Sequence, residues 1–318
     1  TAPVPRRAGG RARRGGGHTV VAAGDLDADG DIDLIVGDAS GRLHLVEDLG
    51  GPGDHRYALP QELEAQGVPF RIDPGPDGVL EGPVAPKLGY ACPALGDWHG
   101  SGRLDLIVGG AGGEILYLRN NGGLTQPRFD RPLALRREGG PLIVPPRIRP
   151  ALADWEGRGD LDLIALDLQG FLCVYPRTDT AEVGEPIYLT DRLGRLIRLD
   201  GGFGQAGRCA LWAGPWTGSG RIDLLVGLPR GARHVLPALT GRPLADLDDL
   251  PTVLLLENAG RNMLIPRPLR LADGRPLLLG SDGCSPSGVA GDNRDALDLV
   301  VGSDDGRVYY LRRDTLRW

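Results

Sequence analysis

An acidic loop near the start of the chain carries the residues best suited to chemistry. Asp25, Asp27 and Asp29 alternate with other residues, and Asp31 and Asp33 follow closely. Hard cations such as calcium take about six to eight oxygen ligands, and a tight loop offers them from alternate residues. Carboxylates this close repel one another unless a cation lies among them. We therefore expect Asp25, Asp27, Asp29, Asp31 and Asp33 to bind Ca²⁺, with Asp31 contributing its backbone carbonyl.

The corresponding loops further along the chain keep fewer acids. The third loop retains Asp154, Glu156 and Asp162, a weaker second candidate site, but Arg158 stands among them. A guanidinium can hold such acids by charge-assisted hydrogen bonds and make a metal ion unnecessary. We expect Asp97 and Asp154 to act as turn-forming side chains that accept backbone N–H bonds.

Each loop leads into a short apolar strand that recurs through the chain. The copies begin at Asp33, Asp105, Asp162, Asp223 and Asp298, between 57 and 75 residues apart. A period of this length indicates repeated supersecondary units. Each unit reads as four antiparallel strands, and the second is apolar throughout, as in a strand buried on both faces. Five motifs therefore predict an all-β fold, a β-propeller of five four-stranded blades; the alternative is a fragment of a larger six- or seven-bladed ring.

Two further features concern how the blades fit together. The fifth unit ends soon after its third strand, and residues 3–8 are the candidate for the missing fourth strand. Trp98, Trp155 and Trp216 each follow the first position of their loop. One tryptophan per unit at the same place predicts packing between blades rather than a platform for sugars.

Composition sets wider limits. We assign residues 1–18 to a flexible Arg/Gly-rich tail and residues 19–318 to a single propeller domain. The formal charge of −6 disfavours nucleic acid as a partner, and no apolar stretch is long enough to span a membrane. The four cysteines form no Cys-x-x-Cys pair, which predicts buried free thiols.

The first loop and its strand, Asp-x-Asp-x-Asp-Gly-x-x-Asp-Leu-Ile-Val-Gly, resemble the FG-GAP/VCBS repeat family. The resemblance spans roughly residues 19–312 and is weaker in the later units. It implies an integrin-like propeller with calcium in the loop between the first two strands of a blade. It also implies a secreted or cell-surface protein that serves in adhesion or carbohydrate binding.

Long loops on the face opposite the acidic loops are the candidate ligand site. Residues 71–90 and 229–251 interrupt the repeat there, and loops on a rigid scaffold often carry function. Arginines suit a carboxylate-bearing sugar, and a His or Tyr could take a proton. The candidate ligand-binding residues are Arg147, Arg149, Arg208, Arg230 and Arg233, and the candidate catalytic residues are His234 and Tyr90.

Two functions follow from these features. The main prediction is a monomeric, extracellular, calcium-stabilised propeller that binds a carbohydrate or protein ligand without catalysis. The alternative is a polysaccharide-active enzyme on the same scaffold, a lyase acting on uronates. A pocket that gathers His234 with arginines would favour the enzyme, whereas a flat, open face would favour the binding module.

Overall fold

The computed structural model describes most of the chain. The described ranges are residues 4–5, 19–50, 55–73, 88–123, 125–199, 209–229, 251–280, 283–290 and 296–318. Within these ranges no helix has the length and apolarity needed to cross a bilayer.

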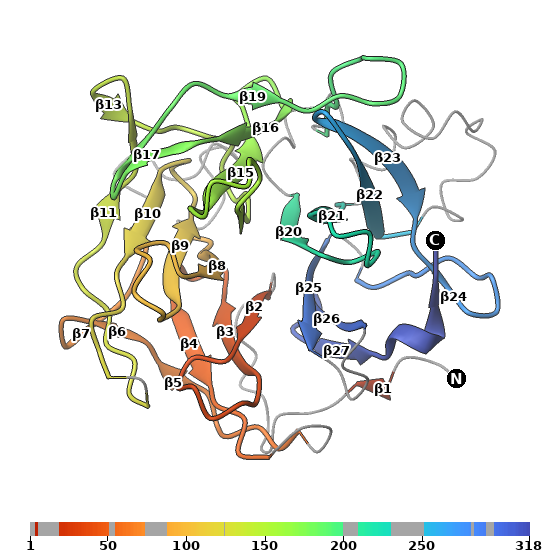
Figure 1. Cartoon of the computed structure of the whole chain (residues 1–318). Coiled ribbons are helices and arrows are strands. Elements are labelled where there is room, and N and C mark those ends of the chain that lie inside the picture. The colour runs from red at the N-terminus through yellow and green to blue at the C-terminus, as the bar shows by residue number, and fades with distance from the viewer. Residues whose placement is uncertain are drawn as a thin grey trace.

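Five four-stranded sheets follow the repeat (Figure 1). The first contains β2 (Val20–Gly24), β3 (Asp33–Gly37), β4 (Leu43–Val46) and β5 (Gln61–Glu62). The second contains β8 (Cys92–Gly96), β9 (Asp105–Gly109), β10 (Ile115–Leu118) and β11 (Leu133–Ala134). The third contains β14 (Ala151–Ala153), β15 (Asp162–Leu166), β16 (Leu172–Tyr175) and β19 (Ile187–Tyr188). The fourth contains β20 (Ala210–Gly214), β21 (Asp223–Gly227), β22 (Val253–Gly260) and β23 (Met263–Pro268).

The fifth sheet draws strands from both ends of the described chain. It contains β25 (Cys284–Ala290), β26 (Leu297–Ser303), β27 (Val308–Leu311) and β1 (Val4–Pro5), in the order β1-β27-β26-β25. Val4 lies opposite Tyr310 in an antiparallel pair. The prediction that residues 3–8 supply the fourth strand is therefore confirmed for β1, while the rest of the tail lies outside the described residues.

A sixth four-stranded sheet was not predicted. It joins β12 (Arg136–Arg137), β13 (Gly140–Pro141), β17 (Arg177–Asp179) and β18 (Glu182–Val183). The second and third units contribute one hairpin each, and the two hairpins meet through a parallel bridge between Arg136 and Glu182. The propeller of four-stranded blades is confirmed, but the described chain has six four-stranded sheets rather than the five that five motifs predicted.

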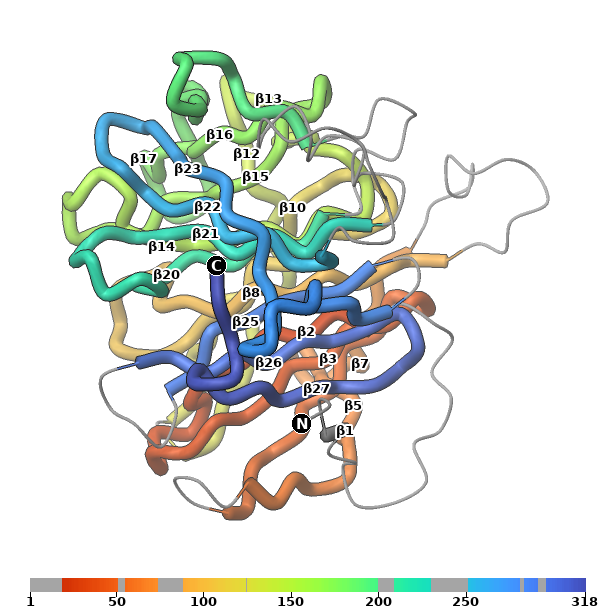
Figure 2. Tube along the Cα trace, turned by 90° about the vertical axis from the view of Figure 1, so that its right-hand side faces the viewer, coloured from red at the N-terminus to blue at the C-terminus, as the bar shows by residue number. Residues whose placement is uncertain are grey.

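The innermost strands contact one another in a closed cycle. β2 contacts β8, β8 contacts β14, β14 contacts β20, β20 contacts β25, and β25 returns to β2. Figure 1 looks onto this arrangement, and Figure 2 shows it from the side. Two short ribbons lie apart from these sheets, β6 (Glu64–Ala65) with β7 (Val68–Pro69) and β24 (Arg270–Leu271) with β28 (Leu316–Arg317).

Apolar side chains fill the space between neighbouring sheets. Where the fifth sheet meets the first, Val21 and Leu34 pack with Val289 and Val300. Every residue of β9, β15 and β21 is buried, as the apolar second strand of the repeat predicted. Burial on both faces makes these strands the core of each blade.

Steric crowding explains why glycine ends the second strand of a blade. A side chain at Gly37 would overlap the carbonyl oxygen of Ala91, and one at Gly227 would overlap that of Cys284. Both oxygens belong to the chain entering the next blade, so only glycine allows the two backbones to approach this closely.

Tryptophans join the blades as predicted. Trp98 is fully buried and its indole N–H donates to the carbonyl oxygen of Thr180 at 2.8 Å. The indole of Trp155 donates to the side chain of Asn262 at 3.0 Å. Both partners belong to the following unit of the repeat. All four cysteines are free and buried, which confirms that prediction.

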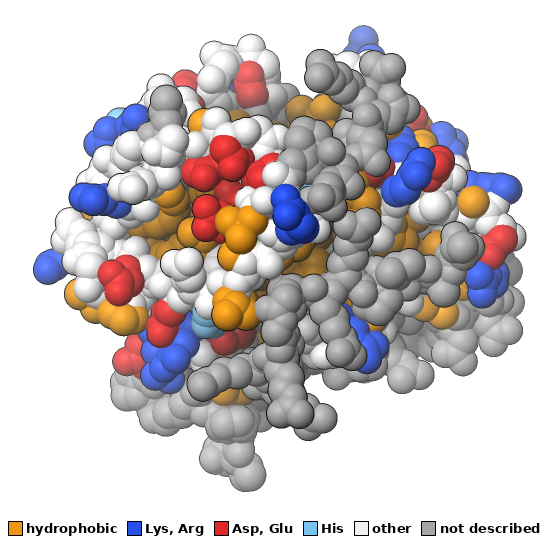
Figure 3. Space-filling view, turned by 90° about the horizontal axis from the view of Figure 1, so that it is seen from below, with side chains coloured by type: hydrophobic (Ala, Val, Ile, Leu, Met, Phe, Trp, Pro, Cys, Tyr) orange, Lys and Arg blue, Asp and Glu red, His pale blue; other side chains and the backbone are white. Residues whose placement is uncertain are grey.

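The outer surface carries its charge unevenly. On the face drawn in Figure 3, several Asp and Glu side chains gather in one patch, whereas Lys and Arg side chains are dispersed.

Candidate functional site

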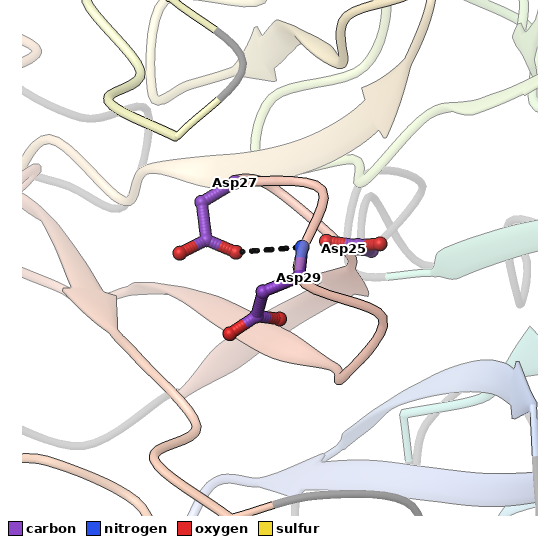
Figure 4. Close-up of side chains that lie close together, drawn as sticks. All are labelled: Asp25, Asp27 and Asp29. Carbon is purple, nitrogen blue, oxygen red and sulfur yellow. Dashed lines mark hydrogen bonds between the residues drawn. The ribbon is translucent and has the colours of Figure 1, made fainter.

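The acidic loop connects β2 to β3 and brings three carboxylates together. Oxygens of Asp25, Asp27 and Asp29 all lie within 4.8 Å of one another (Figure 4). The backbone N–H of Gly30 donates to Asp25 at 3.2 Å, and that of Asp29 donates to Asp27 at 3.3 Å. These bonds curl the loop so that its side chains converge.

The next two acids lie deeper. Asp31 is only 5% exposed. Burial, aided by the neighbouring Asp29, raises the pKa of Asp31 to about 7, and burial raises the pKa of Asp33 to about 6. One carboxylate oxygen of Asp25 and one of Asp31 are buried with no hydrogen-bond partner in the described chain. Orphaned carboxylate oxygens beside three converging carboxylates fit a hard cation such as Ca²⁺.

In the third loop an arginine side chain offsets the negative charge of the carboxylates. Arg158 contacts Glu156 at 3.3 Å and also binds the carboxylate of Asp162. Asp154 accepts backbone N–H bonds from Arg158 and Gly159 at 2.7 and 2.8 Å. The arginine supplies the positive charge among the acids of the predicted second site, which lessens the need for a metal ion there.

Asp97 behaves like Asp154. It accepts backbone N–H bonds from Ser101 and Gly102 at 2.8 and 2.7 Å. The turn-forming role predicted for both side chains is confirmed. The corresponding loop of the fifth unit, around Asp292 and Asp295, lies outside the described residues.

A small pocket lies where the innermost strands begin, at the other end of β2 from the acidic loop. It has a volume of about 50 Å³. Of the predicted site residues, Tyr90, Arg147 and Arg149 line it together. Arg208, Arg230, Arg233 and His234 lie outside the described residues. The lining residues are Thr19, Val20, Tyr90, Ala91, Cys92, Arg147, Arg149, Ala210, Gly283, Cys284, Ser285 and Asp304. We call this the axial pocket.

Tyr90 and Arg147 form a stacked pair in the axial pocket. The guanidinium carbon of Arg147 lies 3.6 Å from the centre of the Tyr90 ring. Both residues have a left-handed backbone, with φ of 48° at Tyr90 and 67° at Arg147. Bulky residues rarely adopt this conformation, and such strain gathers at functional sites. Backbone bonds to Ala39 and Gly110 hold the two residues in place.

Arg149 is buried behind this pair, with 3% of its surface exposed. Its guanidinium donates to the carbonyl oxygens of Pro93 and Pro286 and to the hydroxyls of Ser285 and Ser287. These partners belong to the second and fifth sheets, so the side chain spans the ring. Burial lowers the pKa of Arg149 to about 9, and the group remains charged at neutral pH.

Among the described lining residues of the axial pocket, sequence reasoning missed three with titratable side chains. Cys92 and Cys284 begin innermost strands, and their shared position in the repeat was the signal available. Burial raises the pKa of Cys92 to about 12, so it stays a neutral thiol. Asp304 is the only carboxylate among the described lining residues, and the repeat contains no motif that would have indicated its role.

Comparison with known proteins identifies the fold of the chain but does not show its family. No protein-family model and no curated protein sequence matches the chain. The GH43_1 enzyme from Xanthomonas citri, complexed with xylotriose, is similar in structure, with a TM-score of 0.53. Its identity is 12%, over 98% of this chain and 89% of that chain. The RS223 β-xylosidase has a TM-score of 0.51 and 10% identity, over 99% and 94% of the two chains. At such identities the likeness shows a shared β-propeller fold.

These solved structures correct the main functional prediction. Both are enzymes, and one holds an oligosaccharide. The prediction of a non-catalytic binding propeller is therefore overturned as the leading interpretation. The resemblance to FG-GAP/VCBS repeats stays a prediction, because no family model matches the chain.

Proposed function

We propose that the protein is a polysaccharide-active enzyme whose active site is the mouth of the axial pocket. The observation that carries the proposal is the stacked pair of Tyr90 and Arg147, two strained residues that line one pocket. Similar propellers support catalysis on carbohydrate, since one is a β-xylosidase and another was captured with xylotriose.

The residues of the pocket suit elimination better than hydrolysis. In a uronate polymer, the phenolate of Tyr90 would take the C5 proton while the C4–O4 bond breaks. A C4=C5 double bond forms, and the phenol of Tyr90 returns the proton to the departing O4, which regenerates the phenolate. The nearby guanidinium groups stabilise the negative charge that develops at the carboxylate. Hydrolysis of glycosides uses two carboxylates about 5–9.5 Å apart, and the described lining offers only Asp304.

We also propose that the loop of Asp25, Asp27 and Asp29 binds Ca²⁺, with Asp31 and Asp33 as further ligands. The orphaned oxygens of Asp25 and Asp31 support this assignment. Because the loop and the axial pocket lie at opposite ends of β2, the ion would stabilise the first blade rather than join the reaction. A monomer at the cell surface or outside the cell is the setting that we propose.

We infer that five of the six four-stranded sheets are the blades of the ring. The closed cycle of contacts among β2, β8, β14, β20 and β25 supports this count. The sheet of β12, β13, β17 and β18 is then an accessory layer formed by hairpins of two neighbouring units.

The test is a panel of polymers incubated with the purified protein. Uronate polymers such as polygalacturonate and alginate are followed by the absorbance of the unsaturated product. Neutral arabinan and xylan are followed by the release of reducing ends. We expect an unsaturated product from a uronate polymer, and its loss in Tyr90→Phe but not in the exposed control Tyr188→Phe.

Hydrolysis of neutral polymers is the second candidate, because the similar solved structures include a β-xylosidase. If reducing ends are released from xylan or arabinan and no unsaturated product forms, the enzyme acts by hydrolysis and not by elimination. No product from any polymer would refute the proposal of an enzyme.

A further inference from the structure

No acidic side chain among the described residues pairs with the guanidinium of Arg149. All its hydrogen-bond partners are neutral oxygens, those of Pro93, Ser285, Pro286 and Ser287. In the described part of the chain Arg149 makes no ion pair. A guanidinium has five N–H donors, and the four bonds leave one donor on Nη2 without an acceptor among the described residues.

Burying such a charge is costly unless an anion accompanies it. An unpaired charge in a protein interior loses its hydration and gains no partner in return. Burial lowers the pKa of Arg149 only to about 9, which leaves the charge present at neutral pH. Attraction to an anion in the axial pocket, which Arg149 lines, would offset the desolvation free energy of this buried charge.

The lining of the axial pocket favours a small anion. Arg147 and Arg149 bring two positive charges, while Asp304 brings one negative charge. Asp304 also accepts a hydrogen bond from the hydroxyl of Ser303 at 3.2 Å. The described lining is therefore net positive.

The volume limits which anion can enter. At about 50 Å³ the pocket is far smaller than the roughly 300 Å³ of the smallest usual ligand sites. A sugar ring would have to stay outside, whereas a single planar carboxylate could enter. Guanidinium groups bind carboxylates with favourable geometry and charge.

We propose that the axial pocket is a receptor for the carboxylate of an acidic sugar, with Arg149 at its base and the sugar ring held outside. The proposal rests on the proposed function for the sugar, and it deepens that function by making Arg149 the residue that selects acidic over neutral substrates. Tyr90 and Arg147 at the same pocket would then face the carbon that bears the carboxylate.

The experiment compares two sugars that differ at one group, a charged carboxylate in one and its neutral methyl ester in the other. D-galacturonic acid and its methyl ester are titrated into the full-length protein by calorimetry. We expect the acid to bind at least tenfold more tightly than the ester. Arg149→Met and Arg147→Gln should each reduce this preference at least tenfold, whereas the exposed control Arg275→Gln should keep it. If Arg149→Met does not fold, the preference for the acid is measured in Arg147→Gln and Arg149→Lys instead.

The outcomes separate this inference from the proposed function. Equal binding of acid and ester, no measurable binding of the acid, or a preference that survives both arginine changes would overturn the carboxylate receptor, even if the protein cleaves a neutral polymer. Acetate that binds as tightly as galacturonate would show that the sugar contributes nothing, which also overturns it. A clear preference for the acid without cleavage of any polymer would support the receptor and refute catalysis.

Discussion

At the scale of single residues, the aspartate that begins each second strand has one structural role throughout the repeat. Asp105 accepts backbone N–H bonds from His99 in its loop and from Asn120 after the third strand, at 2.8 and 2.7 Å. Asp33, Asp162 and Asp223 make the same pair of bonds, and Asp298 makes the second of them. The motif therefore retains this acid even where the loop has lost the others.

Replacing one such aspartate tests this role without touching the acidic loop. Asp223 is fully buried and also accepts a bond from the hydroxyl of Thr217 at 2.8 Å. Asp223→Ala leaves two partly buried N–H groups without acceptors, so we expect the free energy of unfolding to fall by about 2–4 kcal/mol. Chemical denaturation measures the loss, and the exposed Asp273→Ala is the control. An equal, small effect of both changes would contradict the structural role.

We expect the acidic loop to make stability depend on both pH and calcium. The folded-state pKa of Asp31, about 7, and that of Asp33, about 6, lie above the ordinary value of 3.8. Between pH 3.8 and these raised pKa values, the folded protein therefore holds more protons than the unfolded chain. Without a cation, stability falls as pH rises from about 4 to about 7. Bound Ca²⁺ favours the ionised carboxylates and opposes this fall.

Thermal unfolding in EDTA and in calcium checks this prediction. We expect the Tm in EDTA to drop between about pH 4 and about pH 7, and calcium to raise it most at the higher pH. Asp27→Asn should weaken the calcium effect, whereas Asp314→Asn, in an exposed ion pair with Arg312, should leave it intact. A Tm that ignores calcium at every pH would rule out the cation site.

At the scale of elements, close backbone contact between blades depends on the glycine that ends the second strand. A methyl group at Gly227 would overlap the carbonyl oxygen of Cys284, which is backbone and cannot swing aside. We expect Gly227→Ala to destabilise the protein by about 1–3 kcal/mol. Gly112 has open space where its side chain would project, so Gly112→Ala is the matched control in the same denaturation experiment. Equal stability of the two variants would show that the blades can move apart.

The elements also show what a sequence can predict. The second strands each repeat an aspartate followed by three apolar residues, and this signal was enough to predict the strands, their burial and the propeller. The strands of the accessory sheet are only two or three residues long, too short for a hydrophobic period to appear. Tyr90, Arg147 and Arg149 were placed on one face because each precedes an innermost strand. Their left-handed backbones and the buried bonds of Arg149 depend on packing between distant units, which no local pattern encodes.

At the scale of the whole molecule, one network crosses the axis of the propeller. Arg149 binds the second and fifth sheets, and Ser285 and Ser287 pass the network on to Val21 in the first sheet at 3.2–3.3 Å. The first, second and fifth sheets are thus linked through one guanidinium. Arg149 also lines the axial pocket, so under our proposal stability and ligand recognition share a residue.

This sharing leads to a prediction that separates the two roles. Arg149→Met keeps much of the volume but removes four buried hydrogen bonds, and we expect a loss of about 2–4 kcal/mol in the free energy of unfolding. Ser287→Ala breaks one bond of the network and should cost about 0.5–1.5 kcal/mol while preserving the preference for galacturonate over its ester. Denaturation and calorimetry on both variants, with Arg275→Met as the control, measure the two effects independently. If Arg149→Met is as stable as the native protein, the network does not hold the ring together, and the buried charge is retained for the ligand alone.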